Sequence, residues 1–209
     1  MRIIAGEARG RKLLTPRDGS IRPPLDKMRG SIFSVVGDSI ERMAVLDLFA
    51  GVGSMGLEAV SRGARRAIFV DKSPASLDIL RRNIEALGFG PRTEVIQGDA
   101  LRVPDLAQAD FPPLAFVFLD PPFPLFKDAG LTRRLFDRVG EILRSSVLVS
   151  GANVFLRVPA SYLDSTAISE HASSSEPISS SEPTSSSNRT PTPREVRSHG
   201  ESRILRWVR

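Results

Sequence analysis

The chain has 209 residues, of which 41% are hydrophobic, enough to bury one core with a small appendage. It has no run of 18 apolar residues and no cysteine, which excludes a transmembrane helix, disulfides and thiolate metal sites. The start of the chain lacks the apolar stretch of a secretory signal, so we expect a cytoplasmic protein that is not attached to a membrane.

The net charge of +5 is concentrated at the start of the chain, where residues 1–29 alone carry an excess of that size. Arginine predominates over lysine, and its planar guanidinium suits phosphates and base edges. A solvated basic surface or a genomic bias toward arginine is the alternative interpretation. We predict that this segment contacts a nucleic acid, through Arg2, Arg9, Arg11, Arg22 and Arg29.

The pattern of apolar residues predicts a small hairpin over residues 1–15 and a helix over 25–36. From Val45 onward, apolar strands alternate with amphipathic helices. Strands are predicted at 45–49, 67–70, 93–96, 115–119 and around 154–156, with a final strand at 202–208. This alternation is typical of an α/β fold in which helices cover both faces of a parallel sheet.

Residues 169–193 are rich in Ser, Pro and Thr and nearly devoid of apolar side chains, which predicts a disordered segment. Because a strand pattern resumes after it, we interpret it as an insertion within the domain. The predicted organisation is a basic hairpin and linker, a core, the insertion, and the last strands of the core sheet, at 1–24, 25–168, 169–193 and 194–209.

A glycine-rich turn follows the first predicted core strand. Glycines at positions 51, 53 and 56 let a ligand approach the backbone, and the next helix supplies free N–H groups. Asp71, about 20 residues further on, is placed to bind ribose hydroxyls. Both a dinucleotide and S-adenosylmethionine (SAM) fit this turn, and tight packing alone is a third explanation of its glycines.

The tetrapeptide Asp120-Pro121-Pro122-Phe123 follows a predicted central strand, at the sheet edge where α/β proteins bind ligands. Asp120 and a carbonyl oxygen fixed by the prolines can accept both hydrogens of an exocyclic base amine, and Phe123 offers an aromatic face. This arrangement indicates methyl transfer to such an amine, and a dehydrogenase has no use for it. A proline-rich loop with Phe123 in the core is the structural alternative.

Asp99 follows the third strand and is either an acceptor for the adenine amine of the cofactor or the N-cap of a helix that begins at Ala100 and Leu101. The two histidines, His171 and His199, have no partners at metal-ligand spacing, and we expect both to be exposed.

The chain resembles the RsmD-type 16S rRNA guanine-N2 methyltransferases. The resemblance covers nearly the whole chain apart from the Ser/Pro-rich segment. It rests on four motifs in order, which are Arg2-Ile3-Ile4-Ala5-Gly6, Arg22-Pro23 with Asp26, Arg29 and Phe33, the turn Asp47 to Ala59, and Asp120 to Phe123.

The resemblance implies a Rossmann-like methyltransferase sheet with strand order 3-2-1-4-5-7-6, the last strand antiparallel. It implies a SAM-dependent enzyme without a metal, acting on a guanine of 16S rRNA, free or in the small ribosomal subunit, without an obligate protein partner. The catalytic residues would be those of the tetrapeptide, and the cofactor residues Asp47, Phe49, Ala50, Gly51, Gly53, Gly56, Asp71, Lys72, Asp99 and Ala100. The alternatives are an enzyme acting on adenine N6 or a protein amide, and a non-catalytic RNA-binding protein on the same fold.

Overall fold

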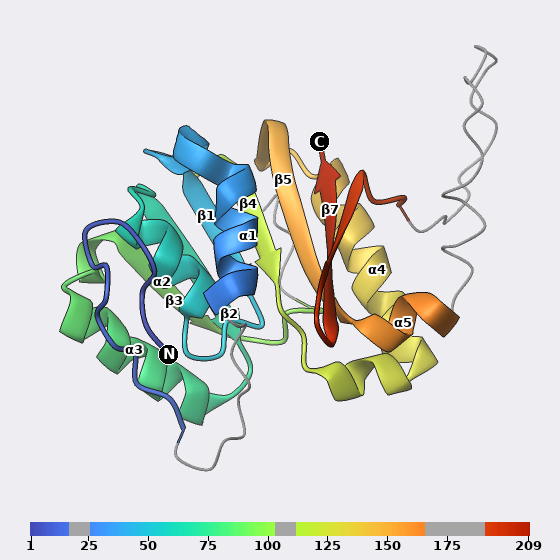
Figure 1. The fold of residues 1–209 in the computed structure, drawn as a ribbon, viewed down its shortest axis with the longest axis horizontal. Coiled ribbons are helices and arrows are strands. Elements are labelled where there is room, and N and C mark those ends of the chain that lie inside the picture. Colours follow the sequence, from blue (N-terminus) through green and yellow to red (C-terminus); the bar gives the residue numbers. More distant parts are fainter. Residues whose placement is uncertain (17–25, 103–111, 166–190) are drawn as a thin grey trace.

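The computed structural model describes residues 1–16, 26–102, 112–165 and 191–209, which form one seven-stranded sheet flanked by helices (Figure 1). The predicted insertion lies outside the described residues, except for positions 191–193. In the described part, no helix is long and apolar enough to cross a membrane. The helices are α1 (Asp26–Val36), α2 (Ser54–Ser61), α3 (Pro74–Leu87), α4 (Ala129–Arg144) and α5 (Ala160–Ser165). The strands are β1 (Ala44–Leu48), β2 (Arg66–Asp71), β3 (Thr93–Gln97), β4 (Leu114–Leu119), β5 (Leu148–Pro159), β6 (Glu195–His199) and β7 (Ser202–Val208).

The strand order is β3-β2-β1-β4-β5-β7-β6, which confirms the predicted methyltransferase topology. The first five strands are parallel, whereas β7 pairs antiparallel with both β5 and β6. All residues of β1 and β4 are buried, as expected for central strands covered on both faces.

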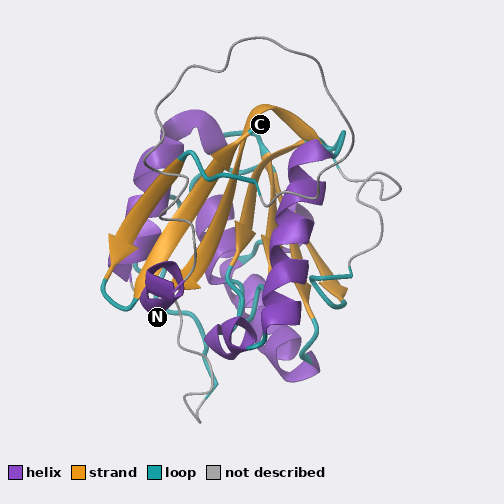
Figure 2. Ribbon diagram, turned by 90° about the vertical axis from the view of Figure 1, so that its right-hand side faces the viewer, coloured by secondary structure: helices purple, strands orange, loops and turns teal. Residues whose placement is uncertain are grey.

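Helices lie on both faces of the sheet (Figure 2). Successive strand residues point to opposite faces, so the sheet separates two apolar layers. Val45, Phe69 and Phe118 pack with α1, α2 and α3, whereas Leu46 and Ile68 pack in the layer that contains α4. Because β1 pairs in parallel with both β2 and β4, the carboxyl ends of these three strands meet at one edge of the sheet.

The chain from Met1 to Leu13 turns back on itself and lies against α2. The Ile3 N–H donates to the carbonyl of Arg11, and one bridge pairs Arg2 with Lys12. A Cβ atom on Gly6 would lie 1.7 Å from the carbonyl oxygen of Ser61, so only glycine fits where the turn meets the helix.

Two elements differ from the sequence prediction. β5 begins at Leu148, well before the predicted segment around 154–156, because its first half contains Ser150 and Gly151 and lacks an apolar pattern. The short helix α5 follows β5 directly and was not predicted.

Candidate active site

The glycine-rich turn joins β1 to α2 and is built on left-handed backbone. Gly51 and Gly53 have φ angles of 54° and 86°, and Phe49 has a φ of 58° although it carries a side chain. Such a conformation costs free energy for a non-glycine residue and is typical of functional turns. The turn is held in place by β2, since Ala50 donates its N–H to the carbonyl of Val70.

Asp47, near the end of β1, supports this turn through a hydrogen bond to its backbone. Its side chain is 1% exposed, and its Oδ2 accepts the N–H of Gly56 at 2.8 Å. Burial raises the pKa of Asp47 well above its usual value, the Gly56 hydrogen bond opposes this, and the nearby charges of Asp120 and Asp71 add to the increase. Asp47 thus holds the start of α2 and positions the turn, and its assignment to cofactor binding stays a prediction.

Packing restricts two of the three glycines, and at Gly53 the φ of 86° also disfavours any other residue. A Cβ atom on Gly53 would lie 2.3 Å from a methyl group of Leu80, and one on Gly56 would lie 2.3 Å from the ring of Phe69. The packing alternative raised from the sequence therefore accounts for these two positions, and their contact with a cofactor stays a prediction. Gly51 is different, because its N–H donates to Oδ2 of Asp71 at 2.8 Å.

Asp71 ends β2 beside the turn and is partly exposed. Its Oδ1 accepts the N–H of Ser73 at 2.8 Å, so both carboxylate oxygens are fixed by backbone donors. Each oxygen keeps a further lone pair with which it can accept a hydroxyl. Asp71 is therefore presented at the sheet edge in one orientation.

The remaining predicted cofactor residues lie along the same edge. Lys72 is exposed, and Ala100 is buried. Asp99 accepts the N–H of Leu101 at 3.0 Å, which is the local capping bond weighed against adenine recognition. Its carboxylate also lies 3.7 Å from Arg102 and keeps a solvent-accessible side.

The tetrapeptide follows β4 and lies directly next to the turn. Asp120 donates its backbone N–H to the carbonyl of Leu48, at the end of β1, over 3.3 Å. Pro121 is buried, Pro122 is exposed and Phe123 is partly exposed. The Pro122 carbonyl accepts the N–H of Leu125, so it caps the following 3-10 helix, Phe123–Lys127. This carbonyl keeps a second lone pair, so the carbonyl acceptor predicted beside Asp120 stays a prediction.

Arg157 of β5 contacts this tetrapeptide at two points and was missed by the sequence analysis. Its Nη1 lies 3.0 Å from Oδ1 and 3.4 Å from Oδ2 of Asp120, and its guanidinium carbon lies 4.6 Å from the ring centre of Phe123. The Nε of Arg157 donates to Oγ of Ser202 at 3.2 Å. The available signal was a single charge within the apolar run from Val154 to Val158.

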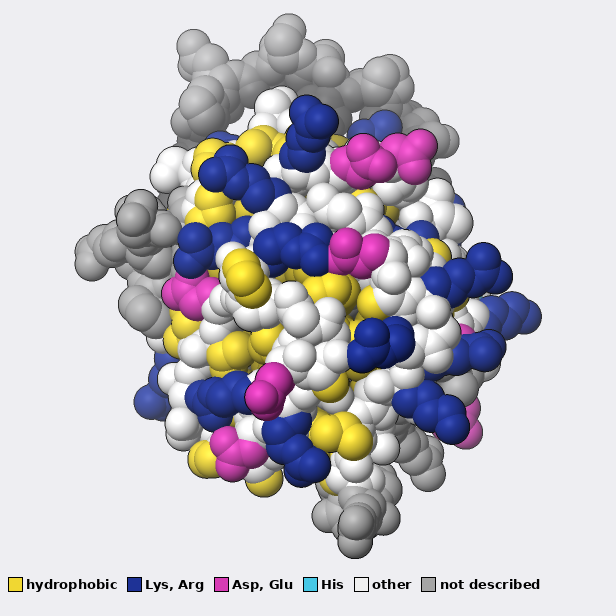
Figure 3. Space-filling model, turned by 90° about the vertical axis from the view of Figure 1, so that its left-hand side faces the viewer, with side chains coloured by type: hydrophobic (Ala, Val, Ile, Leu, Met, Phe, Trp, Pro, Cys, Tyr) yellow, Lys and Arg dark blue, Asp and Glu magenta, His cyan; other side chains and the backbone are white. Residues whose placement is uncertain are grey.

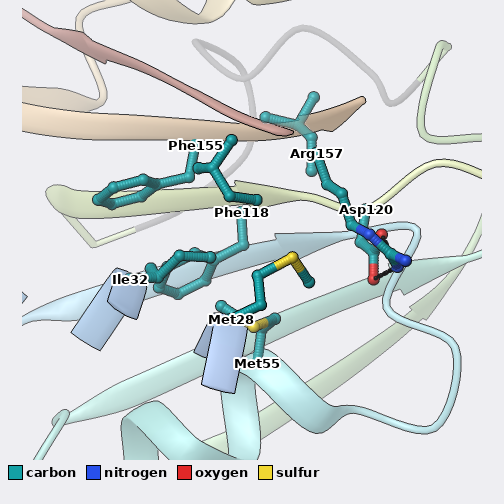
Figure 4. Close-up of a pocket in the computed structure, with 9 residues that line it drawn as sticks. Met28, Ile32, Met55, Phe118, Asp120, Phe155 and Arg157 are labelled. Carbon is teal, nitrogen blue, oxygen red and sulfur yellow. Dashed lines mark hydrogen bonds and ion pairs between the residues drawn. The ribbon is translucent and has the colours of Figure 1, made fainter. Parts of the chain in front are cut away.

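The two charged side chains lie at the mouth of an apolar pocket (Figure 4). Asp120 is 21% exposed and Arg157 is 14% exposed. Burial raises the pKa of Asp120, and the adjacent Arg157 opposes the increase. The rest of the pocket is lined by Met28, Ile32, Met55, Phe118, Leu119, Phe155 and Ile204.

The arginines predicted to contact nucleic acid are separated by the structure. Arg2, Arg9 and Arg11 are exposed on the N-terminal hairpin, and Figure 3 shows Lys and Arg side chains spread over that side of the molecule. Arg2 lies 3.3 Å from the carboxylate of Asp26. Arg22 lies outside the described residues.

The prediction for Arg29 is wrong, because this side chain is fully buried. Its guanidinium donates to the carbonyls of Ser54 and Arg2 and pairs with Asp26 at 2.8 Å. Arg29 therefore joins α1 to the hairpin and to the start of α2, and it cannot reach RNA. A charged residue is rarely buried unless it is paired, so sequence alone favoured the exposed interpretation.

Glu58 and Ser61 of α2 hold the hairpin and were also missed as functional residues. Glu58 is fully buried, and its carboxylate accepts the N–H groups of Ile4 and Ala5 at 2.7 and 3.0 Å. Ser61 accepts the N–H of Ala8. The signal was a glutamate within an otherwise apolar and small helix, Ser54–Ser61.

Comparison with known proteins identifies the family. The family model described as "Conserved hypothetical protein 95" matches residues 1–153. The chain belongs to this family. The resemblance to RsmD-type enzymes is confirmed by a relative from Escherichia coli K12 named "Ribosomal RNA small subunit methyltransferase D", which is 38% identical over 123 residues. That alignment covers 59% of this chain and 60% of the relative, so it spans less than two thirds of the relative's length.

Solved structures extend the similarity to the whole fold. The Escherichia coli protein yhhF has a TM-score of 0.70 and 25% identity, covering 100% of this chain and 97% of that chain. A hypothetical protein of Thermus thermophilus has a TM-score of 0.68 and 27% identity, covering 99% of this chain and 98% of that chain. The similarity therefore includes the second half of β5 and the strands β6 and β7, which follow the last residue that the family model matches.

Proposed function

We propose that this protein is a SAM-dependent methyltransferase that methylates the N2 amine of a guanine in small-subunit ribosomal RNA. The observation that carries the proposal is the hydrogen bond from Asp120 to Leu48, which brings the tetrapeptide next to the glycine-rich turn. Two motifs that lie some 70 residues apart in the sequence thereby form one site at the carboxyl edge of the sheet, where α/β folds bind their ligands.

The residues of the turn fit SAM better than a dinucleotide. A pyrophosphate would bind free N–H groups at the start of α2, but the Gly56 N–H is already taken by Asp47. Two further carboxylates, Asp71 and Asp120, lie close enough to influence the pKa of Asp47. Arg157 compensates the charge of Asp120, so Asp71 supplies the negative charge beside the turn that favours a cation such as a sulfonium over a diphosphate.

Asp71 is the residue that would hold the ribose of SAM, because its fixed oxygens can each accept one hydroxyl of a vicinal diol. The cofactor supplies an electrophilic methyl group. The turn from Phe49 to Gly53 and the partly exposed Asp99 complete the set of residues that we assign to cofactor binding, with Lys72 and Ala100 beside them.

Asp120 and Phe123 act on the base. The ionised Asp120 accepts a hydrogen from the N2 amine, orients its nitrogen and stabilises the positive charge that develops there. Phe123 offers a face on which the base can stack. Asp120 must be ionised for this role, and its position at the mouth of an apolar pocket strengthens its electrostatic effect.

The exposed arginines of the hairpin support RNA as the substrate. Arg2, Arg9 and Arg11 would contact phosphates, while the target base is turned out of its stack to reach Asp120. Glu58 holds this hairpin against α2, close to the turn. We place the protein in the cytoplasm, where bacterial ribosomal RNA is made.

Transfer of a labelled methyl group tests the proposal. Ribosomal RNA is extracted from bacterial cells that lack the corresponding enzyme and is incubated with SAM and the purified protein. We expect label in 16S rRNA with the wild type and almost none with Asp120→Ala at equal SAM affinity. Absence of label with a folded wild-type protein that binds SAM would refute the proposed function.

A further inference from the structure

The position of Arg157 raises a conflict with the proposed role of Asp120. The carboxylate that should accept the amine of the base is paired with Nη1 of Arg157, at 3.0 and 3.4 Å. The ring on which the base should stack has the same guanidinium 4.6 Å from its centre. Arg157 thus makes both contacts that the mechanism assigns to the substrate.

The chemistry of the two groups explains the coincidence. In guanine, the atoms N1, C2, N2 and N3 form a planar guanidine unit, with one N–H donor at N1 and two at N2. A guanidinium group is also planar, donates through the same kind of N–H groups and stacks on aromatic rings. Adenine has no such unit at its amine. The Asp120 and Phe123 surfaces therefore suit a guanidine fragment, from either the protein or the base.

We propose that Arg157 is a place-holder for the target base: its guanidinium occupies the base subsite until a guanine with the same donor pattern displaces it. This inference rests on the proposed function and adds a residue that controls access and specificity. Displacement requires no change in the backbone, because a flexible aliphatic stem joins the guanidinium to β5.

The contacts of Arg157 favour a movable side chain over a fixed structural one. It is partly exposed at the mouth of the pocket, and its partners are Asp120, the Phe123 ring and the hydroxyl of Ser202. Both members of the ion pair reach solvent at the pocket, so an entering base meets them directly. An entering base would replace both contacts of Arg157, because its amine donates a hydrogen bond to Asp120 and its ring stacks on Phe123.

The test uses Arg157→Met, which keeps the apolar stem and removes the guanidinium, with Arg206→Met as the matched control. Arg206 is also an ion-paired arginine of this sheet region, but its partner is Glu195. Steady-state methylation of extracted 16S rRNA is measured over a range of pH, and the proteins are compared where the activity of each no longer rises with pH, so that Asp120 is ionised in each. If Arg157 occupies the base subsite most of the time, the apparent dissociation constant for RNA equals the intrinsic one divided by the fraction of protein with a free subsite.

We expect Arg157→Met to lower the KM for RNA by about fivefold, with kcat within about threefold of the wild type. Guanidinium chloride should then inhibit this variant competitively with RNA, beyond the effect of sodium chloride at equal ionic strength. The wild type and Arg206→Met should show no such difference. A kcat reduced tenfold or more at unchanged KM, restored by guanidinium, would overturn the proposal, because Arg157 would then act on Asp120 during the reaction.

Ser202→Ala decides the question if Arg157→Met is unstable. This variant removes the acceptor of the Arg157 Nε and leaves the ion pair in place. A lower KM for RNA at unchanged kcat supports the place-holder, and an unchanged KM contradicts it. Failure of the wild type to methylate this RNA would instead refute the proposed function, so the two failures are distinguishable.

Discussion

Asp120 offers the most informative substitution in the proposed active site. Asp120→Ala removes the acceptor of the base amine and leaves Arg157 without its carboxylate partner. We expect methylation to fall by about 10²-fold or more, as for other preorganised electrostatic contacts. SAM affinity should stay within about threefold, because the residues assigned to SAM lie on β1, β2 and β3 and their loops.

Asp120→Asn is the sharper variant because it keeps the shape and one acceptor oxygen. The ion pair with Arg157 is mostly buried, so weakening it should cost about 1.5–3 kcal/mol. In a chain of this size, each 1 kcal/mol lowers the melting temperature by about 2–4 °C. Activity should lie between that of the wild type and that of the alanine variant, since the amide lacks the charge that stabilises the developing cation.

The pH dependence gives an independent readout. Burial raises the pKa of Asp120, and only its ionised form accepts the amine hydrogen, so kcat/KM should rise with pH through a raised pKa. Because Arg157 opposes that increase, Arg157→Met should move the rise to still higher pH. Asp120→Asn should lack this step.

For the Asp120→Ala and Asp120→Asn variants, melting temperature, SAM affinity by calorimetry and single-turnover methylation are measured on the same preparations. Full methylation by Asp120→Ala would refute the mechanism. Loss of melting temperature and SAM affinity together in both variants would show that Asp120 only stabilises the loop.

Three further predictions concern the cofactor, the RNA and the hairpin. Asp71→Ala should weaken SAM binding by about 1.5–3 kcal/mol, the range for a hydrogen bond to a charged group, and calorimetry showing unchanged affinity would remove the assignment. Replacing Arg2, Arg9 and Arg11 together by alanine should weaken RNA binding. The slope of log affinity against log salt concentration should become shallower by about 0.7–0.9 for each lost phosphate contact, and an unchanged slope would show that the hairpin does not bind RNA. Glu58→Ala leaves two partly buried N–H groups without their acceptor, so it should lower stability by about 2 kcal/mol and expose the hairpin to hydrogen exchange, whereas unchanged protection there would contradict the docking role.

The fold was predictable because local patterns and global topology agree. The apolar runs of β1 and β4 and the helix from Pro74, ended by Gly88, lie where the sequence placed them. The strand order itself came from the family resemblance and not from periodicity. β5 was predicted too short, because pairing with β4 and β7 extends a strand whose first half has no apolar pattern.

The site was predictable only where motif residues face its interior. Asp71 and Asp120 lie at the expected sheet edge, but the sequence could not show that Asp47 and Arg29 are buried. Both belong to motifs, but they stabilise the backbone of neighbouring segments. Asp47 accepts a backbone N–H, and Arg29 donates to backbone carbonyls. Arg157 was invisible for a different reason, since its partner is Asp120, 37 residues earlier in the chain, and only the pairing of β4 with β5 brings them together.

The identity of the methylated nucleoside decides whether the protein methylates guanine N2. Ribosomal RNA methylated by the wild-type protein is digested to nucleosides and analysed by mass spectrometry. We expect N2-methylguanosine, formed only with an intact Asp120. Label found as N6-methyladenosine, or as guanosine methylated at a ring nitrogen, would show that guanine N2 is not the target.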